Sequence, residues 1–464
     1  MGAARRQHLV AVRGAGALVQ LAAVRSSVRP RRKKRYQRGT SGIDARADRR
    51  VGGLRRCQPG GSRGANQPVR TVAGASRKLS EPVTTVSLQG GKGTRRRGVR
   101  ACRRRSGTCR RRSGTSLPAA LSLLLLTAPA WGETFRLTAG GPQSASLPWI
   151  GIIGSLVVPE SNVRLEAMGS EHRIVWREAY GGSLYKWQNS LEAIEIGLTD
   201  IGWVGALWET SKMPLQNVTY YTPFVTDDLR LLLDLFNDLH ETLPALAEAW
   251  EEQNQILLGA AGVDTYHLMS TFPVSRVEDM QGRKILAPGP SATWLEGTGA
   301  VPVNGGLSTY YTQISTGVAD GVLTILSGAY PYRIHEVAPY ITLVGIGAQF
   351  NGGVAINLDT WERLPADVQA VMSELGRDYS RTLADVVIQR YEDALAAVQL
   401  EGAQVTTLPD AEKRKWIDGL PDIAGQWVRS AEARGHPAGE TLRAYMAELR
   451  ARGEEPLRNW DAPR

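Results

Sequence analysis

Cysteine is absent from most of this sequence. The three cysteines of the 464-residue chain, Cys57, Cys102 and Cys109, all lie within its first 115 residues. The rest of the chain therefore cannot form a disulfide, a thiolate nucleophile or a cysteine-ligated metal site. No cysteine follows the apolar segment near residue 120 either, so we expect no lipid anchor at a cleavage-site cysteine.

Motifs of the common enzyme and cofactor classes are also lacking. The histidines of residues 116–464 are not spaced as His-Glu-x-x-His, and neither a Gly-x-Ser-x-Gly turn nor a Walker loop occurs. Gly297-Thr298-Gly299 does not complete a dinucleotide fingerprint, because Pro302 stands at the position of the third glycine. We therefore expect no catalytic residues, no metal and no cofactor.

Acidic residues are scarce in the first 115 residues, which carry 31 lysine and arginine residues against Asp44, Asp48 and Glu81. This block is rich in arginine, glycine and serine, and no helical or strand periodicity persists in it. We predict that residues 1–115 are a basic disordered or non-native N-terminal extension. Such a block is either a nucleic-acid-binding arm or, as we favour, sequence outside the mature protein.

Residues 116–132 have the features of a secretory signal peptide. Arg110–Arg112 precede an apolar run over residues 117–127, and small residues follow it up to Gly132. The run is shorter than the roughly 20 residues that span a bilayer. We expect export to the periplasm with cleavage after Ala130 or Gly132. The mature chain would then carry 25 basic and 42 acidic residues, so we expect no nucleic-acid partner for it.

The mature chain alternates between short apolar runs and helical patterns. Strands are predicted near residues 134–138, 172–176, 200–204, 256–259, 267–270, 284–287, 301–303 and 320–325. Helices are predicted over residues 185–196, 231–253 and 307–316. This alternation is typical of an α/β fold with parallel sheets, in which ligands bind beyond the carboxyl ends of the strands.

A long helix is predicted after Leu364. Pro365 suits its first turn, and apolar residues then recur at three- and four-residue steps from Val368 to Val398. A helix of about nine turns is long enough to join two domains. Two shorter helices broken near Gly376 are the alternative.

Aromatic residues and paired glycines stand at several predicted strand ends and turns. Small-molecule sites are concave and largely apolar, with a few polar groups that fix the ligand. The pattern therefore favours a binding cleft. The residues concerned are Trp203, Phe224, Tyr310, Tyr311 and Phe350, with predicted loops at Gly140-Gly141, Gly305-Gly306 and Gly352-Gly353.

The segment from Val274 to Gly321 resembles the TRAP-type (C4-dicarboxylate-type) solute-binding proteins. Asp279–Pro288 matches the family's "DLKGLKIRVP" word, and Thr309–Gly321 matches "EVYTALQTGVVDG" in the expected order. The segments at Gly181-Gly182, Glu195–Gly202 and Trp361–Val368 resemble further family words. The resemblance implies a two-domain periplasmic-binding-protein clamshell with a long connecting helix spanning both domains. It also implies capture of a small solute and delivery to TRAP membrane permease subunits.

One departure from the family concerns the ligand. The family's carboxylate-binding arginine follows "KI", and the matching residue here is Leu286. An alkyl side chain cannot grip a carboxylate as a guanidinium does. We therefore expect a ligand that is less acidic or more apolar than a dicarboxylate. The candidate ligand-binding residues are Gln143, Trp203, Phe224, Leu286, Asn304, Tyr311, Thr324 and Phe350, and we expect Trp203, Leu286 and Tyr311 to share one cavity.

The predicted organisation has two interleaved domains. Domain I comprises residues 133–263 and 352–391, and domain II comprises residues 264–351 and 392–464 with the C-terminal helices. We expect a monomer that catalyses nothing. A binding protein of an ABC-type importer and an exported enzyme on the same scaffold are the two rival hypotheses.

Overall fold

The structure is a computed structural model that describes residues 132–462. These residues belong to the unit that runs from Leu117 to Arg464. The basic block, and almost all of the predicted signal peptide, lie outside the described residues.

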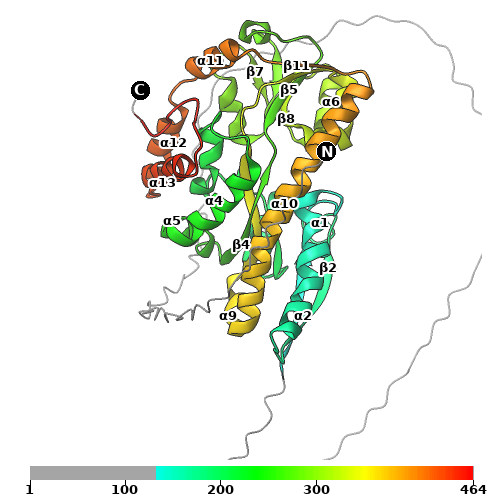
Figure 1. Ribbon diagram of the computed structural model, residues 1–464, viewed down its shortest axis with the longest axis vertical. Coiled ribbons are helices and arrows are strands. Elements are labelled where there is room, and N and C mark those ends of the chain that lie inside the picture. Colours follow the sequence, from blue (N-terminus) through cyan, green and yellow to red (C-terminus); the bar gives the residue numbers. More distant parts are fainter. Residues whose placement is uncertain (1–131, 463–464) are drawn as a thin grey trace, which may run out of the picture. The chain divides into compact units, whose positions relative to one another are not determined.

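Two β-sheets form the framework (Figure 1). The first sheet has the strand order β2-β1-β3-β10-β4, and the second has the order β11-β9-β5-β8-β6-β7. The strands of the first sheet are β1 Thr134–Gly140, β2 Arg173–Ala179, β3 Ile201–Val204, β4 Gln255–Val263 and β10 Gln349–Asn357. Those of the second are β5 Tyr266–Ser270, β6 Lys284–Leu286, β7 Val301–Val303, β8 Gly321–Ile325, β9 Tyr340–Leu343 and β11 Gln404–Thr407.

Both sheets are mixed rather than wholly parallel. β1 pairs in parallel with β2 and β3, and β6 pairs in parallel with β7 and β8, as the alternation of strands and helices predicted. β10, however, runs antiparallel to both β3 and β4, and β5 runs antiparallel to β8 and β9. The prediction of parallel sheets is therefore wrong for β5 and β10. β5 follows β4, and β10 follows β9, without the helix that a parallel crossover connection needs.

Helices cover both sheets. The helices that precede β10 are α1 Pro148–Ile152, α2 Val158–Ala167, α3 Ser190–Glu195, α4 Leu229–Thr242, α5 Pro244–Glu251, α6 Leu307–Ser315, α7 Leu326–Ala329 and α8 Ile334–Val337. Those that follow it are α9 Leu358–Arg363, α10 Ala366–Leu400, α11 Asp410–Gly419, α12 Ile423–Glu432 and α13 Ala438–Ala451. Short 3₁₀ segments include η4 Pro214–Tyr221 and η6 Gly289–Leu295, and η1 Ile153–Val157 is a π-helix.

Local sequence explains where α4 begins and ends. The carboxylate of Asp228 accepts a hydrogen bond from the Leu231 amide at the start of the helix. Pro244 cannot continue a helix from the preceding residue, so Leu243 is extended and α5 starts anew. The single helix predicted over residues 231–253 is therefore two helices.

Two other predictions for local structure need correction. The helical pattern over residues 185–196 gives only a 3₁₀ turn and the six-residue α3. Gly352-Gly353, predicted as a loop, lies inside the buried strand β10. A Cβ atom on Gly352 would lie 2.0 Å from the Val204 carbonyl oxygen, so glycine lets β10 approach β3 closely.

Helix α10 is continuous over 35 residues, with Pro365 at its N-cap. It therefore extends for about 50 Å. It packs against β4 of the first sheet and against α4. It also packs against α7, which follows β8 of the second sheet. In Figure 1 α10 runs alongside both sets of strands. The alternative of two helices broken near Gly376 is wrong, because Gly376 is a buried helical residue.

The C-terminal helices return toward the first sheet. α12 and α13 pack against η4, and α13 also packs against α4. The side chain of Trp460 donates a hydrogen bond to the Pro223 carbonyl oxygen over 2.9 Å. The residue ranges assigned above to domains I and II stay a prediction.

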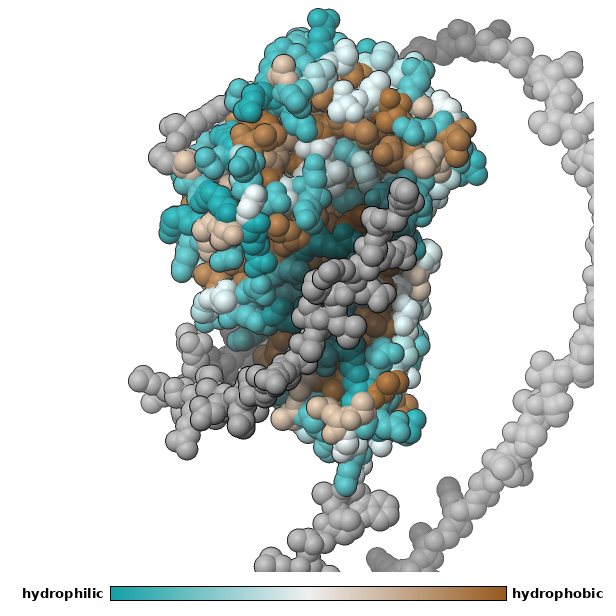
Figure 2. All heavy atoms as spheres, in the orientation of Figure 1, coloured by the Kyte–Doolittle hydropathy of each residue, from teal (hydrophilic) through white to brown (hydrophobic). Residues whose placement is uncertain are grey.

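The surface shows no continuous apolar belt on the face in view. Hydrophobic and hydrophilic residues are interspersed there (Figure 2). None of the helices between residues 132 and 462 has an apolar stretch long enough to cross a membrane.

Candidate ligand-binding site

The first of two crossing segments between the sheets is very short. β4 ends at Val263 and β5 begins at Tyr266, so that only Asp264 and Thr265 lie between them. Asp264 is buried and accepts hydrogen bonds from the hydroxyl and the backbone amide of Ser327. Burial raises the pKa of Asp264 to about 6, although the bonds from Ser327 act in the opposite direction.

The second crossing segment joins β9 to β10 over residues 344–348. The Nδ1 atom of His267 accepts the amides of Val344 and Gly345, each over 3.2 Å. Its other ring nitrogen therefore carries the proton and donates to the Tyr391 hydroxyl of α10 over 3.0 Å. Burial lowers the pKa of His267 to about 4, which keeps the ring neutral.

The contacts of Asp264 tie the first crossing segment to α7, and those of His267 tie the second crossing segment to α10. These contacts were not predicted from the sequence. Their signal was present, because Asp264 and His267 interrupt an otherwise apolar stretch. Buried polar groups of this kind are expected to be hydrogen-bonded.

Trp203 lies near the carboxyl end of β3 with Trp149 and Gln143. The Oε1 atom of Gln143 accepts a hydrogen bond from the Trp149 indole over 2.8 Å, and the rings of Trp149 and Trp203 are 6.2 Å apart. Trp203 is only 5% exposed, and its indole nitrogen has no hydrogen-bond partner among residues 132–462. Trp149 thus contacts two of the predicted residues, Gln143 and Trp203, and the Trp203 indole nitrogen stays a buried donor without a partner among residues 132–462.

Tyr185 covers the other face of the same strand end. A Cβ atom on Gly202 would lie 2.6 Å from the Tyr185 hydroxyl oxygen, and one on Gly140 would lie 2.8 Å from its ring. Gly202 and Trp203 are successive strand residues, so Tyr185 and Trp203 lie on opposite faces of the sheet. The glycines noted in the sequence therefore make room for a tyrosine.

Leu286 and Thr324 lie in the second sheet and are both buried. Leu286 has no exposed surface and belongs to an apolar cluster with Tyr310, Ile314 and Val322. Thr324 is paired with His267 in the antiparallel register of β5 and β8. Trp203 belongs to a different core cluster from Leu286.

Asn304 and Tyr311 are both exposed, Asn304 in the loop before α6 and Tyr311 in the middle of that helix. The Asn304 carbonyl oxygen accepts a hydrogen bond from the Gln313 amide over 3.1 Å. Tyr311 is 39% exposed, whereas its neighbour Tyr310 is buried against Leu286. Successive helical residues point in different directions, which separates Tyr311 from Leu286.

Phe224 and Phe350 are buried in aromatic contacts. Phe350 stacks on Phe236 with ring centres 4.1 Å apart. Phe224 has a φ of 63° and lies edge-on to Trp416 at 6.1 Å. Both side chains therefore contribute to the core that supports the crossing segments.

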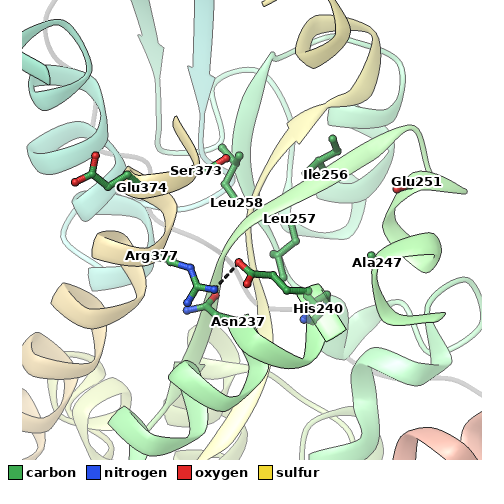
Figure 3. Close-up of a pocket in the computed structure, with 11 residues that line it drawn as sticks. Asn237, His240, Ala247, Glu251, Ile256, Leu257, Leu258, Ser373, Glu374 and Arg377 are labelled. Atoms are coloured by element: carbon green, nitrogen blue, oxygen red, sulfur yellow. Dashed lines mark hydrogen bonds and ion pairs between the residues drawn. The ribbon is translucent and has the colours of Figure 1, made fainter. Parts of the chain in front are cut away.

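A cavity of about 500 Å³ lies on the first sheet, between α4, α5, β4 and α10 (Figure 3). Its floor is apolar at Leu257 and Leu258, and Arg377 lies across it. Arg377 is already paired with Glu241 and, at 3.2 Å, with Asp238. A second cavity of about 460 Å³ lies between η4, η6 and α12. Neither of these two cavities is lined by any of the eight predicted residues.

Two sheets, two crossing segments and one spanning helix define a two-domain binding-protein fold. A sequence profile described as bacterial extracellular solute-binding protein, family 7, matches residues 164–428. This match covers more than half of the chain. The protein therefore belongs to this family of TRAP-type solute-binding proteins, which is a family of binding proteins and not of enzymes.

Three relatives illustrate the similarity. A solute-binding protein of Sulfitobacter sp. strain NAS-14.1 is 27% identical over 210 residues, which are 44% of this chain and 61% of that protein. The C4-dicarboxylate-binding periplasmic protein DctP of Rhodobacter capsulatus is 24% identical over 58% of this chain and 81% of its own length. A Sulfitobacter TRAP periplasmic solute-binding protein solved with β-D-galacturonate has a TM-score of 0.55 at 17% identity. That comparison covers 68% of this chain and all of the other.

Proposed function

We propose that this protein is the extracytoplasmic solute-binding subunit of a TRAP-type secondary transporter. It captures one small organic molecule between the two sheets and delivers it to the membrane permease, without catalysing a reaction. The family membership carries this proposal, together with the unpartnered indole of Trp203 at the end of β3. The predicted signal peptide supports a periplasmic location.

The ligand that we propose is an organic acid with fewer charges than a dicarboxylate, or a more apolar molecule. The names of two relatives state that they bind a C4-dicarboxylate and galacturonate. The family's arginine position is Leu286 here, and this side chain is wholly buried among apolar neighbours. A single acceptor group on the solute would instead satisfy the Trp203 indole, because a buried donor without a partner is costly.

Native mass spectrometry of the protein purified from its own host identifies the bound solute, and calorimetry with that solute gives its affinity. We expect Trp203→Phe to weaken binding about tenfold, since it removes the indole donor and keeps an aromatic ring. Trp361→Phe on α9 is the matched control and leaves the affinity unchanged. Equal affinities for both variants would show that Trp203 does not contact the solute.

A further inference from the structure

The cavity of about 460 Å³ lies apart from the residues considered so far. It is bounded by the turn before η4, by η4 itself, by η6 and by α12. η4 follows β3 of the first sheet and η6 follows β6 of the second. A molecule held there would touch η4, which follows a strand of the first sheet, and η6, which follows a strand of the second.

One wall of this cavity is aromatic. The rings of Tyr221 and Trp427 are stacked with centres 5.7 Å apart and planes 17° from parallel. The Trp427 indole donates to the Pro214 carbonyl oxygen over 3.2 Å, which fixes the orientation of its ring. Such a wall favours the apolar face of a sugar-like or aromatic ring.

Arg434 is the charged residue that lines the cavity. Its guanidinium donates to the backbone carbonyl oxygens of Thr210, Ser211 and Ser430. It makes no ion pair with any residue in the described part of the chain, 132–462. These neutral contacts hold the exposed guanidinium in place and leave it without a carboxylate partner among these residues, so that it can pair with an anion.

Asn217 lines the same cavity from η4. Its side chain is 1% exposed, and its Nδ2 atom donates to the carbonyl oxygens of Ala206 at 3.0 Å and Met213 at 3.2 Å. These two bonds set the orientation of the amide. The Oδ1 atom has no hydrogen-bond partner within residues 132–462 and is closed off from solvent, so the amide serves to fix the η4 wall of the cavity.

We propose that this cavity is a second binding site, which takes a ring-shaped hydroxylated monocarboxylate. Arg434 pairs with the carboxylate, and the Tyr221–Trp427 wall contacts the ring. Thr293 and Ser430 also line the cavity and are the polar partners that we propose for the hydroxyl groups of the ligand. This site is separate from the cleft of the proposed function and does not depend on it.

The test uses protein labelled with 5-fluorotryptophan and fluorine NMR, with D-galacturonate as the probe. The resonances of Trp427 and Trp203 are assigned from Trp427→Phe and Trp203→Phe. We expect D-galacturonate to shift the Trp427 resonance at concentrations at least tenfold lower than the neutral sugar D-galactose. Arg434→Gln should weaken this response by about 10- to 100-fold, because it removes a charge-assisted contact. Arg429→Gln is the control, since Arg429 lies on α12, close to Arg434 in the chain, and pairs with Asp422.

Each outcome bears on one site only. A Trp427 resonance that D-galacturonate leaves unchanged, or moves equally in Arg434→Gln, would overturn the second site. An equal response to inorganic phosphate would reduce it to a simple anion site and would also overturn the proposal. The Trp203 resonance reports on the cleft. If the host-derived solute does not shift this resonance, the result counts against the proposed function alone.

Discussion

At the scale of single residues, Asp264 gives the stability of the protein a distinct pH dependence. Its pKa is about 6 in the folded protein and about 4 in an unfolded chain. Between these values the folded state binds more protons than the unfolded state. The contribution of Asp264 to stability is therefore complete below about pH 4 and is lost as the pH rises through 6. The full change amounts to about 3 kcal/mol.

Chemical denaturation of the wild type and of Asp264→Asn from pH 4 to pH 7 measures this contribution. We expect the stability difference between the two proteins to change in that interval, with the wild type losing stability relative to the variant as the pH rises. Asp227→Asn, an exposed carboxylate before α4, is the control. A difference that is constant with pH would mean that Asp264 titrates as an ordinary carboxyl group.

Leu286 tests whether the family's arginine position can be restored. Because this side chain has no exposed surface, Leu286→Arg places a charge inside an apolar cluster. We expect a loss of about 3–5 kcal/mol of folding stability, whereas Leu286→Met should cost less than about 1.5 kcal/mol. Thermal denaturation compares the two variants. A Leu286→Arg protein that stays as stable as the wild type and binds simple carboxylates would instead place residue 286 in the ligand cleft.

At the scale of elements, α10 depends on a glycine contact with β4. A Cβ atom on Gly376 would lie 2.0 Å from the Leu258 carbonyl oxygen, and one on Gly259 would lie 2.0 Å from the Gly376 carbonyl oxygen. We expect Gly376→Ala to destabilise the protein by about 1–3 kcal/mol through overpacking, even though alanine favours helix by about 1 kcal/mol. Ser373→Ala, on the exposed side of the same helix, should be neutral or slightly stabilising. Urea denaturation of both variants gives the comparison, and a Gly376→Ala protein of higher stability would contradict the close contact.

The same elements show how far the sequence alone could lead. The strands near residues 134, 172, 200 and 256, and the uninterrupted α10, follow from apolar periodicity and are confirmed. β10 was missed because it is buried on both faces and contains two glycines, so that it neither alternates nor looks like a strand. β11 was missed because it is short and largely exposed.

The candidate site was harder to predict than the fold. Strand-end positions such as Trp203 follow from the alternation of strands and helices. The partners of a side chain depend instead on segments far apart in the chain, as with Trp149 beside Trp203 or Trp427 beside Tyr221. No local pattern encodes such pairs.

At the scale of the whole molecule, we expect the two sheets to move together when solute binds. The crossing segments are short and few, and cleft closure excludes water from the ligand. Small-angle X-ray scattering with and without the host-derived solute should show a smaller radius of gyration in the complex. At 100 times the dissociation constant the solute should also add about 2.7 kcal/mol of stability. An unchanged radius with normal binding would indicate a cleft that is already closed in the free protein.

The position of β10 between β3 and β4 has a consequence for the order in which the chain folds. Gly353 of β10 pairs with Val204 of β3 and Ala260 of β4. The first sheet is therefore completed only when β10 has been synthesised, long after its other four strands. The entropy of closing such a long loop must be overcome before any of these hydrogen bonds form. During synthesis, the early strands have no central partner until residue 357 has emerged. A chain with this topology cannot complete its first sheet until most of its residues have been synthesised.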